Sequence, residues 1–64
     1  MNPTEIKIEL LRNGISQAEI AKKTNVTRSM VNMVVNGKAR SKKIEDIIAY
    51  EIGQPVEVVF LSTK

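Results

Sequence analysis

Hydrogen-bonding side chains recur on one side of the segment that spans residues 28–36. Steps of about 100° per residue, the spacing of an α-helix, divide this segment into two arcs. One arc is apolar and consists of Met30, Val31, Val34 and Val35. The opposite arc consists of Arg28, Ser29, Asn32, Met33 and Asn36. Arginine can donate two hydrogen bonds to guanine, asparagine can pair with adenine, and serine can bond either edge. This chemistry suits reading bases, although a solvated helix face has the same composition.

Composition argues against catalysis. The chain has no cysteine and no histidine, so thiolate chemistry and the usual general base are both missing. Glu45 and Asp46 are adjacent carboxylates, but they point about 100° apart on a helix and have no third ligand nearby in sequence. We assign them to surface solubility. The chain is therefore expected to be no enzyme and to hold no metal or other cofactor.

Charge is segregated along the chain. Residues 22–43 hold seven basic residues and no acidic one, whereas the other 42 residues hold all seven acids and three bases. Such a face attracts polyanions, with nucleic acid the obvious class. A basic surface that only keeps the protein soluble fits the same pattern.

Length and hydropathy limit the setting. The 64 residues predict one small domain, residues 1–64. A chain of this size buries only about 60% of the surface that its unfolded form exposes, so pairing with a second copy would help it. No apolar run approaches the roughly 18 residues that span a bilayer, and MNPTEIKIEL does not resemble a signal peptide. We expect a cytoplasmic protein without a membrane segment.

Capping signals predict five short helices and an all-α fold. Asn2-Pro3 starts a helix that Asn13-Gly14 ends, and its Ile6, Ile8, Leu10 and Leu11 are expected to be mostly buried. Ser16 and Glu19 form a capping box for a helix over residues 17–23. Thr27 caps the next helix, and Gly37 after Asn36 ends it. A fourth helix follows Ser41 and continues to Gly53, with its Tyr50 expected to be half-buried.

Residues 55–61 allow two assignments. Pro55 suits the first position of a fifth helix, but Val56, Val58, Val59 and Phe60 are residue types that favour strands. We favour a helical turn that buries Val59 and Phe60. The alternative is a terminal strand that pairs with a second subunit.

The segment over residues 17–36 meets the requirements of a helix-turn-helix. The two helices must cross closely, and Ala21 is the small residue that permits it. The turn needs a residue that tolerates positive φ, and asparagine, here Asn25, is the most tolerant type after glycine. Ile20, Val26, Val31 and Val34 are placed to hold the two helices together.

The helix-turn-helix segment and its flanking helices resemble a known protein family. QAEIAKKTNVTRSMVNMVVNGK resembles the helix-turn-helix of the lambda-repressor-like (Cro/XRE-type) DNA-binding family. IKIELLRNGISQ is similar to that family's first helix, and KKIEDIIAYEIGQPVEVVF to its fourth and fifth, so the resemblance covers the chain to about Phe60. The short layout is also similar to Ner-like regulators. Two residues depart from the pattern: Asn25 replaces the usual glycine, and Thr24 stands where an apolar residue normally packs.

The resemblance assigns candidate roles by position. Gln17 matches a glutamine that contacts the DNA backbone and braces the recognition helix. Arg28, Ser29, Asn32 and Met33 match positions that face bases in the major groove, although Met33 fits the edge of a core equally well. Asn36 and Lys38 match residues that touch phosphates. Thr27, at the amino end of the recognition helix, and the basic Arg40 complete the DNA-binding candidates.

These observations predict a sequence-specific transcriptional regulator of the phage or bacterial repressor type, which binds double-stranded DNA as a homodimer. An antitoxin-type autoregulator and a protein-interaction module without DNA binding are the alternatives. The apolar residues of the fifth helix and the VEVVFL tail are a candidate dimer surface. The operator, the regulated genes, the sign of regulation and any effector or toxin partner are left open.

Overall fold

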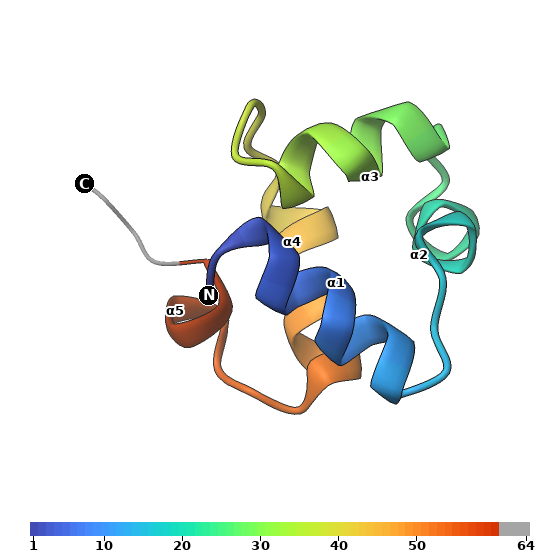
Figure 1. Cartoon of the computed structure of the whole chain (residues 1–64). Coiled ribbons are helices and arrows are strands. Elements are labelled where there is room, and N and C mark those ends of the chain that lie inside the picture. The colour runs from blue at the N-terminus through green and yellow to red at the C-terminus, as the bar shows by residue number, and fades with distance from the viewer. Residues whose placement is uncertain (61–64) are drawn as a thin grey trace.

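Five helices form the described part of the chain. The computed structural model describes residues 1–60 and contains α1 (Pro3–Arg12), α2 (Gln17–Thr24), α3 (Arg28–Val35), α4 (Lys42–Ile52) and α5 (Val56–Val59), as Figure 1 shows. These residues contain no strand, so the all-α prediction is confirmed. The strand alternative is wrong for residues 56–59, and residue 61 lies outside the described residues. Pro55 is the N-cap of α5 rather than its first residue.

Side-chain caps start the first four helices where the sequence predicts. Asn2 and Ser16 each form a capping box, with Glu5 and Glu19 as the respective reciprocal partners. Thr27 and Ser41 accept hydrogen bonds from the backbone N–H groups of Met30 and Ile44. Each cap satisfies a backbone donor that a helix start leaves without an intrahelical partner. The first residues of α2 and α3 are therefore determined by local side-chain hydrogen bonds.

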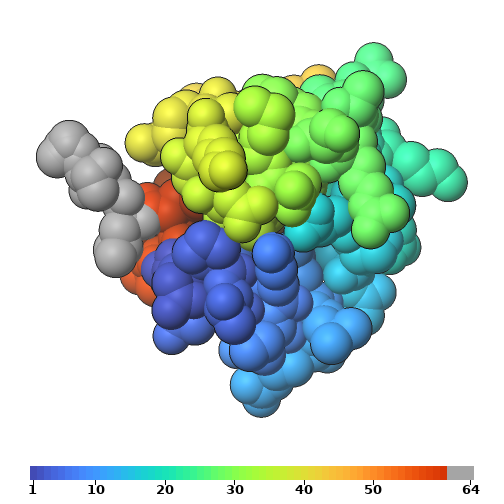
Figure 2. Space-filling view, turned by 45° about the horizontal axis from the view of Figure 1, so that its top comes forward, coloured from blue at the N-terminus to red at the C-terminus, as the bar shows by residue number. Residues whose placement is uncertain are grey.

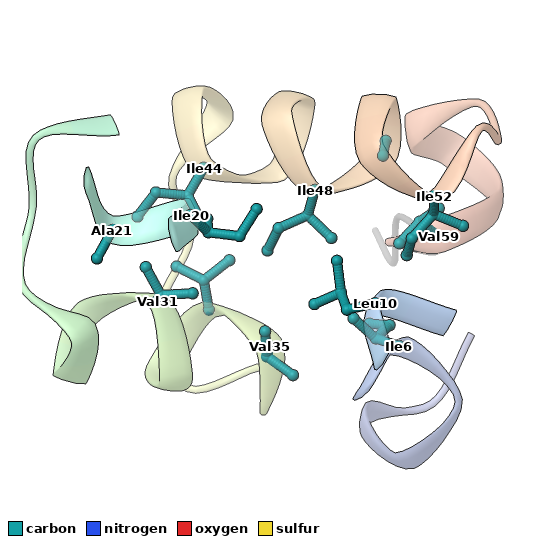
Figure 3. Close-up of a cluster of buried hydrophobic side chains, with 12 residues drawn as sticks. Ile6, Leu10, Ile20, Ala21, Val31, Val35, Ile44, Ile48, Ile52 and Val59 are labelled. Atoms are coloured by element: carbon teal, nitrogen blue, oxygen red, sulfur yellow. The ribbon is translucent and has the colours of Figure 1, made fainter. Parts of the chain in front are cut away.

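The core lies between α4 on one side and α1 and α3 on the other (Figure 3). Ile44 and Ile48 of α4 are fully buried, and Val31 of α3 packs in the same cluster. Val59 of α5 is also fully buried and lies beside Ile52 in Figure 3. The last helix thus completes the core with one valine, while Phe60 packs partly buried against it.

Three apolar or aromatic side chains predicted to be buried (Ile8 and Leu11) or half-buried (Tyr50) are exposed. Ile8 is 49% exposed, Leu11 is 78% exposed, and Tyr50 is 79% exposed. In α1, Ile6 and Leu10 lie one turn apart and both face the core, whereas Ile8 points about 200° away from Ile6. Tyr50 has the same offset from the buried Ile48. One stripe on each helix is enough to fill the core, so the remaining large side chains face outward.

Candidate nucleic-acid interface

α2 and α3 pack against each other across a tight turn. Asn25 lies in the left-handed region at φ 59° and ψ 44°, as the turn requires. The backbone N–H of Val26 donates to the carbonyl oxygen of Ala21 at 3.0 Å, which closes the end of α2. Ala21 and Val31 are buried between the helices and the rest of the core. This arrangement holds α3 with its apolar arc inward.

Thr24 is fully buried at the end of α2, where a polar side chain needs a partner. Its hydroxyl donates a hydrogen bond to the carbonyl oxygen of Ile20 at 2.8 Å. Because this bond lies within α2, the hydroxyl is satisfied without disturbing the packing around it. The departure from an apolar residue is thereby accommodated, and the turn keeps its geometry.

Four predicted contact residues line one hollow. Gln17 of α2 and Arg28, Ser29 and Asn32 of α3 border a polar depression of about 340 Å³. Lys7 of α1 borders the same hollow, although it was not among the contact residues predicted from the sequence. Figure 2 shows the face on which α1, α2 and α3 meet. Through Lys7, α1 becomes the third helix that contributes to this surface. The position of Lys7 could not be predicted from local residue spacing, because it depends on the long-range packing of α1 against α3.

Met33 lies on the exposed arc of α3. Its side chain is 42% exposed, whereas Met30 on the opposite arc packs partly buried against the core. Met33 is therefore accessible to a thymine methyl group, which would give an apolar contact in the major groove. It is not among the residues that border the hollow.

Asn32 and Asn36 are joined by two hydrogen bonds. The Asn36 Nδ2 donates to the Asn32 Oδ1 at 3.1 Å and to the Asn32 carbonyl oxygen at 2.9 Å. Asn36 is half-buried at the end of α3, and Asn32 is exposed one turn earlier. The pair connects a predicted base contact with a predicted phosphate contact.

The remaining candidates lie at the two ends of α3. The Thr27 hydroxyl accepts the Met30 N–H at 3.2 Å, so it serves as a cap. At the other end Gly37 has φ 76°, and the Lys38 N–H donates to the Met33 carbonyl oxygen at 2.8 Å. These bonds close the helix and place the exposed Lys38 directly after it.

The basic residues of the acid-free segment, together with Lys7, divide into two groups. Within residues 1–60, Lys23, Arg40 and Lys42 form ion pairs with Glu51, Glu45 and Asp46 respectively. The side-chain hydrogen bond that each base donates to its carboxylate, followed by the carboxylate's charge, raises the pKa of each of these bases. Lys7, Lys22, Arg28, Lys38 and Lys43 form no ion pair within the described residues. Their charges are available to an external anion.

The assignment of Glu45 to the surface is wrong. Glu45 is only 6% exposed, and its Oε2 accepts a hydrogen bond from the Arg40 Nε at 2.8 Å. Arg40 thus has a structural partner, and its contact with DNA stays a prediction. Asp46 is exposed, as predicted. No group of three acidic side chains among residues 1–60 is arranged to hold a metal ion.

Comparison with known protein families decides the relationship. A family model described as helix-turn-helix matches residues 6–52, which cover most of α1 and all of α2, α3 and α4. The chain belongs to the Cro/XRE-type helix-turn-helix family. This helix-turn-helix protein is accordingly a DNA-binding regulator of that type. Searches among curated proteins and solved structures found no match.

The helix-turn-helix protein has the two helices of its motif at residues 17–24 and 28–35, inside the predicted segment. None of its helices within residues 1–60 combines the length and the apolar character that a membrane crossing demands. The surface next to the motif is polar and carries basic side chains from α1 and α3 that form no ion pair with any of residues 1–60.

Proposed function

We propose that the protein is a sequence-specific transcriptional repressor that places α3 in the major groove and α2 across the DNA backbone. The observation that carries this proposal is the convergence of Lys7, Gln17, Arg28, Ser29 and Asn32 on one polar hollow. Side chains from three helices thus share one accessible surface beside the helix-turn-helix. The repressor would act in the cytoplasm by occupying a promoter, as phage and bacterial repressors do, and it would carry out no reaction.

The side chains of α3 divide base reading among them. Arg28, at the first position of α3, is exposed and suits guanine, whose O6 and N7 accept two hydrogen bonds. Asn32 suits adenine, and Ser29 can bond either kind of edge. Met33 supplies the apolar contact for a thymine methyl group. These four residues would set the sequence preference.

Phosphate contacts would orient the protein on the duplex. Gln17 begins α2, so its side chain and the backbone N–H groups of that first turn can hold one phosphate. Thr27 is the N-cap of α3 and lies beside the first-turn N–H groups of that helix. Lys7 borders the hollow and Lys38 follows the end of α3, and neither has an ion pair within residues 1–60. Such contacts position a protein without reading sequence.

A homodimer would double the small number of base contacts. In this arrangement the two half-sites lie about one helical turn apart on a two-fold operator. Val58 of α5 is 44% exposed and supports the C-terminal surface as the interface. A Ner-like regulator or an antitoxin-type autoregulator would use the same DNA surface, and the proposal covers the binding that they share.

Selection of bound sequences from a random duplex pool tests the proposal. We expect a two-fold motif, and we expect Arg28→Ala to reduce discrimination at one base pair by about 1–3 kcal/mol. Asn32→Ala should relax a different base pair. Arg12→Ala is the matched control, because it removes the same charge from the end of α1 and does not border the hollow.

Two outcomes would contradict the proposal. One is a failure to select any duplex even at low salt, which would favour a protein-interaction module without DNA binding. The other is a selected motif that stays the same in Arg28→Ala and Asn32→Ala, as it should in the control Arg12→Ala. That result would show that α3 does not read bases.

A further inference from the structure

The hydrogen bonds of Asn36 assign its side chain a task inside the protein. An amide NH₂ group has two hydrogens to donate. Both acceptors in reach of the Asn36 Nδ2 belong to Asn32: its carbonyl oxygen at 2.9 Å and its Oδ1 at 3.1 Å. A phosphate oxygen needs a donor, and the donors of Asn36 are already engaged. Direct phosphate binding would require breaking these bonds.

The same contacts determine how Asn32 presents its own amide. With Oδ1 facing Asn36, the Asn32 Nδ2 faces the other way and donates to no acceptor among residues 1–60. The reversed amide would bring the Nδ2 groups of the two asparagines together, donor against donor. The orientation is therefore selected before any DNA arrives. Asn32 also borders the hollow, so its side chain lies at the surface proposed for DNA binding.

A preset amide discriminates between the two purines. Adenine presents a donor at N6 and an acceptor at N7, which match the second lone pair of the Asn32 Oδ1 and the free Nδ2. Guanine presents acceptors at both O6 and N7. Its O6 would face the Asn32 Oδ1, acceptor against acceptor. Guanine could be read by Asn32 only after the amide had left Asn36.

We propose that Asn36 is a positioning residue that holds the Asn32 amide in the orientation that selects adenine. This inference rests on the proposed function, because it requires Asn32 to contact a base. It replaces the predicted phosphate contact of Asn36 with an action through Asn32. Asn36 then contributes to specificity without touching the base itself.

The test compares selected motifs for the unsubstituted protein, Asn32→Ala, Asn36→Ala and Asn36→Asp. Asn36→Ala should lower the adenine-over-guanine preference about 2- to 12-fold, the equivalent of one net hydrogen bond, at the base pair that Asn32→Ala relaxes. Asn36→Asp is isosteric but only accepts, so it should turn the Asn32 amide around and lower the same preference. In an Asn32→Ala background, Asn36→Ala should change the preference no further.

Matched controls separate this role from phosphate binding and from misfolding. Lys38→Gln removes a charge two residues further along and should weaken all sequences equally while leaving the preference intact. Asn36 has φ −85° and ψ 2°, a conformation open to alanine, so Asn36→Ala should keep the helical circular dichroism and cooperative unfolding of the parent.

A uniform loss of affinity in Asn36→Ala, with the adenine preference unchanged, would overturn the inference and leave Asn36 as a phosphate contact. This result is distinct from failure of the proposed function, in which the unsubstituted protein itself shows no sequence preference.

Discussion

At the scale of single residues, the turn between α2 and α3 depends on Asn25 and Thr24. Asn25 is the only residue other than glycine with positive φ among residues 1–60. Asparagine tolerates this conformation because its side chain is short and polar, whereas a residue such as alanine is strained there. Thr24 fills its buried position while bonding within its own helix. Both departures from the family pattern therefore preserve the motif.

Substitution of Asn25 tests this account. Asn25→Ala should lower the free energy of unfolding by about 1–2 kcal/mol, the cost of a left-handed conformation for a residue with a Cβ. Asn25→Gly is the matched control, since it removes the same polar group and should leave stability unchanged or slightly higher. Denaturant unfolding measures both. Equal stability of the alanine and glycine variants would show that the left-handed conformation does not limit the turn.

At the scale of elements, α2 is held against α4 as well as against α3. The Lys23 Nζ donates to the Glu51 Oε2 at 2.9 Å and so joins two helices that are 28 residues apart at these positions. The hydrogen bond that Lys23 donates to Glu51, followed by the charge of Glu51, raises the pKa of Lys23. This contact helps to keep α2 in place on the side of the motif away from α3.

The raised pKa predicts how stability depends on pH. A base whose pKa is higher in the folded protein stabilises it fully below the unfolded value, about 10.4 for lysine. That contribution disappears as the pH rises through the folded pKa. The protein should therefore lose stability in this alkaline range, and Lys23→Gln should show a shallower loss. Thermal unfolding from pH 8 to about 12 measures it. Parallel curves for the two proteins would contradict the contribution of Lys23.

At the scale of the whole molecule, net charge is less informative than the pairing of each charge. The chain carries a formal charge of +3, yet three of its basic residues are engaged by carboxylates on α4. The bases without an ion pair in the described part of the chain include Lys7 and Arg28 at the hollow. A positive surface therefore arises where α1, α2 and α3 meet. It includes Lys7, which lies outside the acid-free segment, and it lacks the free charges of the three paired bases in that segment.

This distribution predicts the salt dependence of DNA binding. Lys7→Gln should reduce the slope of log K against log salt by about 0.9, the contribution of one phosphate contact. Lys42→Gln is the matched control, because Lys42 is already paired with Asp46 and should leave the slope nearly unchanged. Titrations of one duplex at several salt concentrations measure both slopes. Equal slopes for the two variants would exclude Lys7 from the interface.

Much of the fold was predictable because its signals are local. Capping by Asn2, Ser16, Thr27 and Ser41 depends on residues within one helical turn, and so does the left-handed turn at Asn25. The division of α3 into two arcs follows from helical spacing alone. The sequence by itself therefore determined the helices, the motif and the outward face of α3.

Only the tertiary structure decided which side chains share a surface. Ile8 and Leu11 are as apolar as Ile6 and Leu10, and the packing of α1 determines which pair is buried. Glu45 is buried beside Arg40, and Lys7 reaches the hollow through the packing of α1 beside α3. Helical spacing gives the angle between side chains on one helix but not the rotation of that helix against its neighbours. That rotation follows from the packing of the whole core, and it brought Lys7 to Gln17, Arg28 and Asn32.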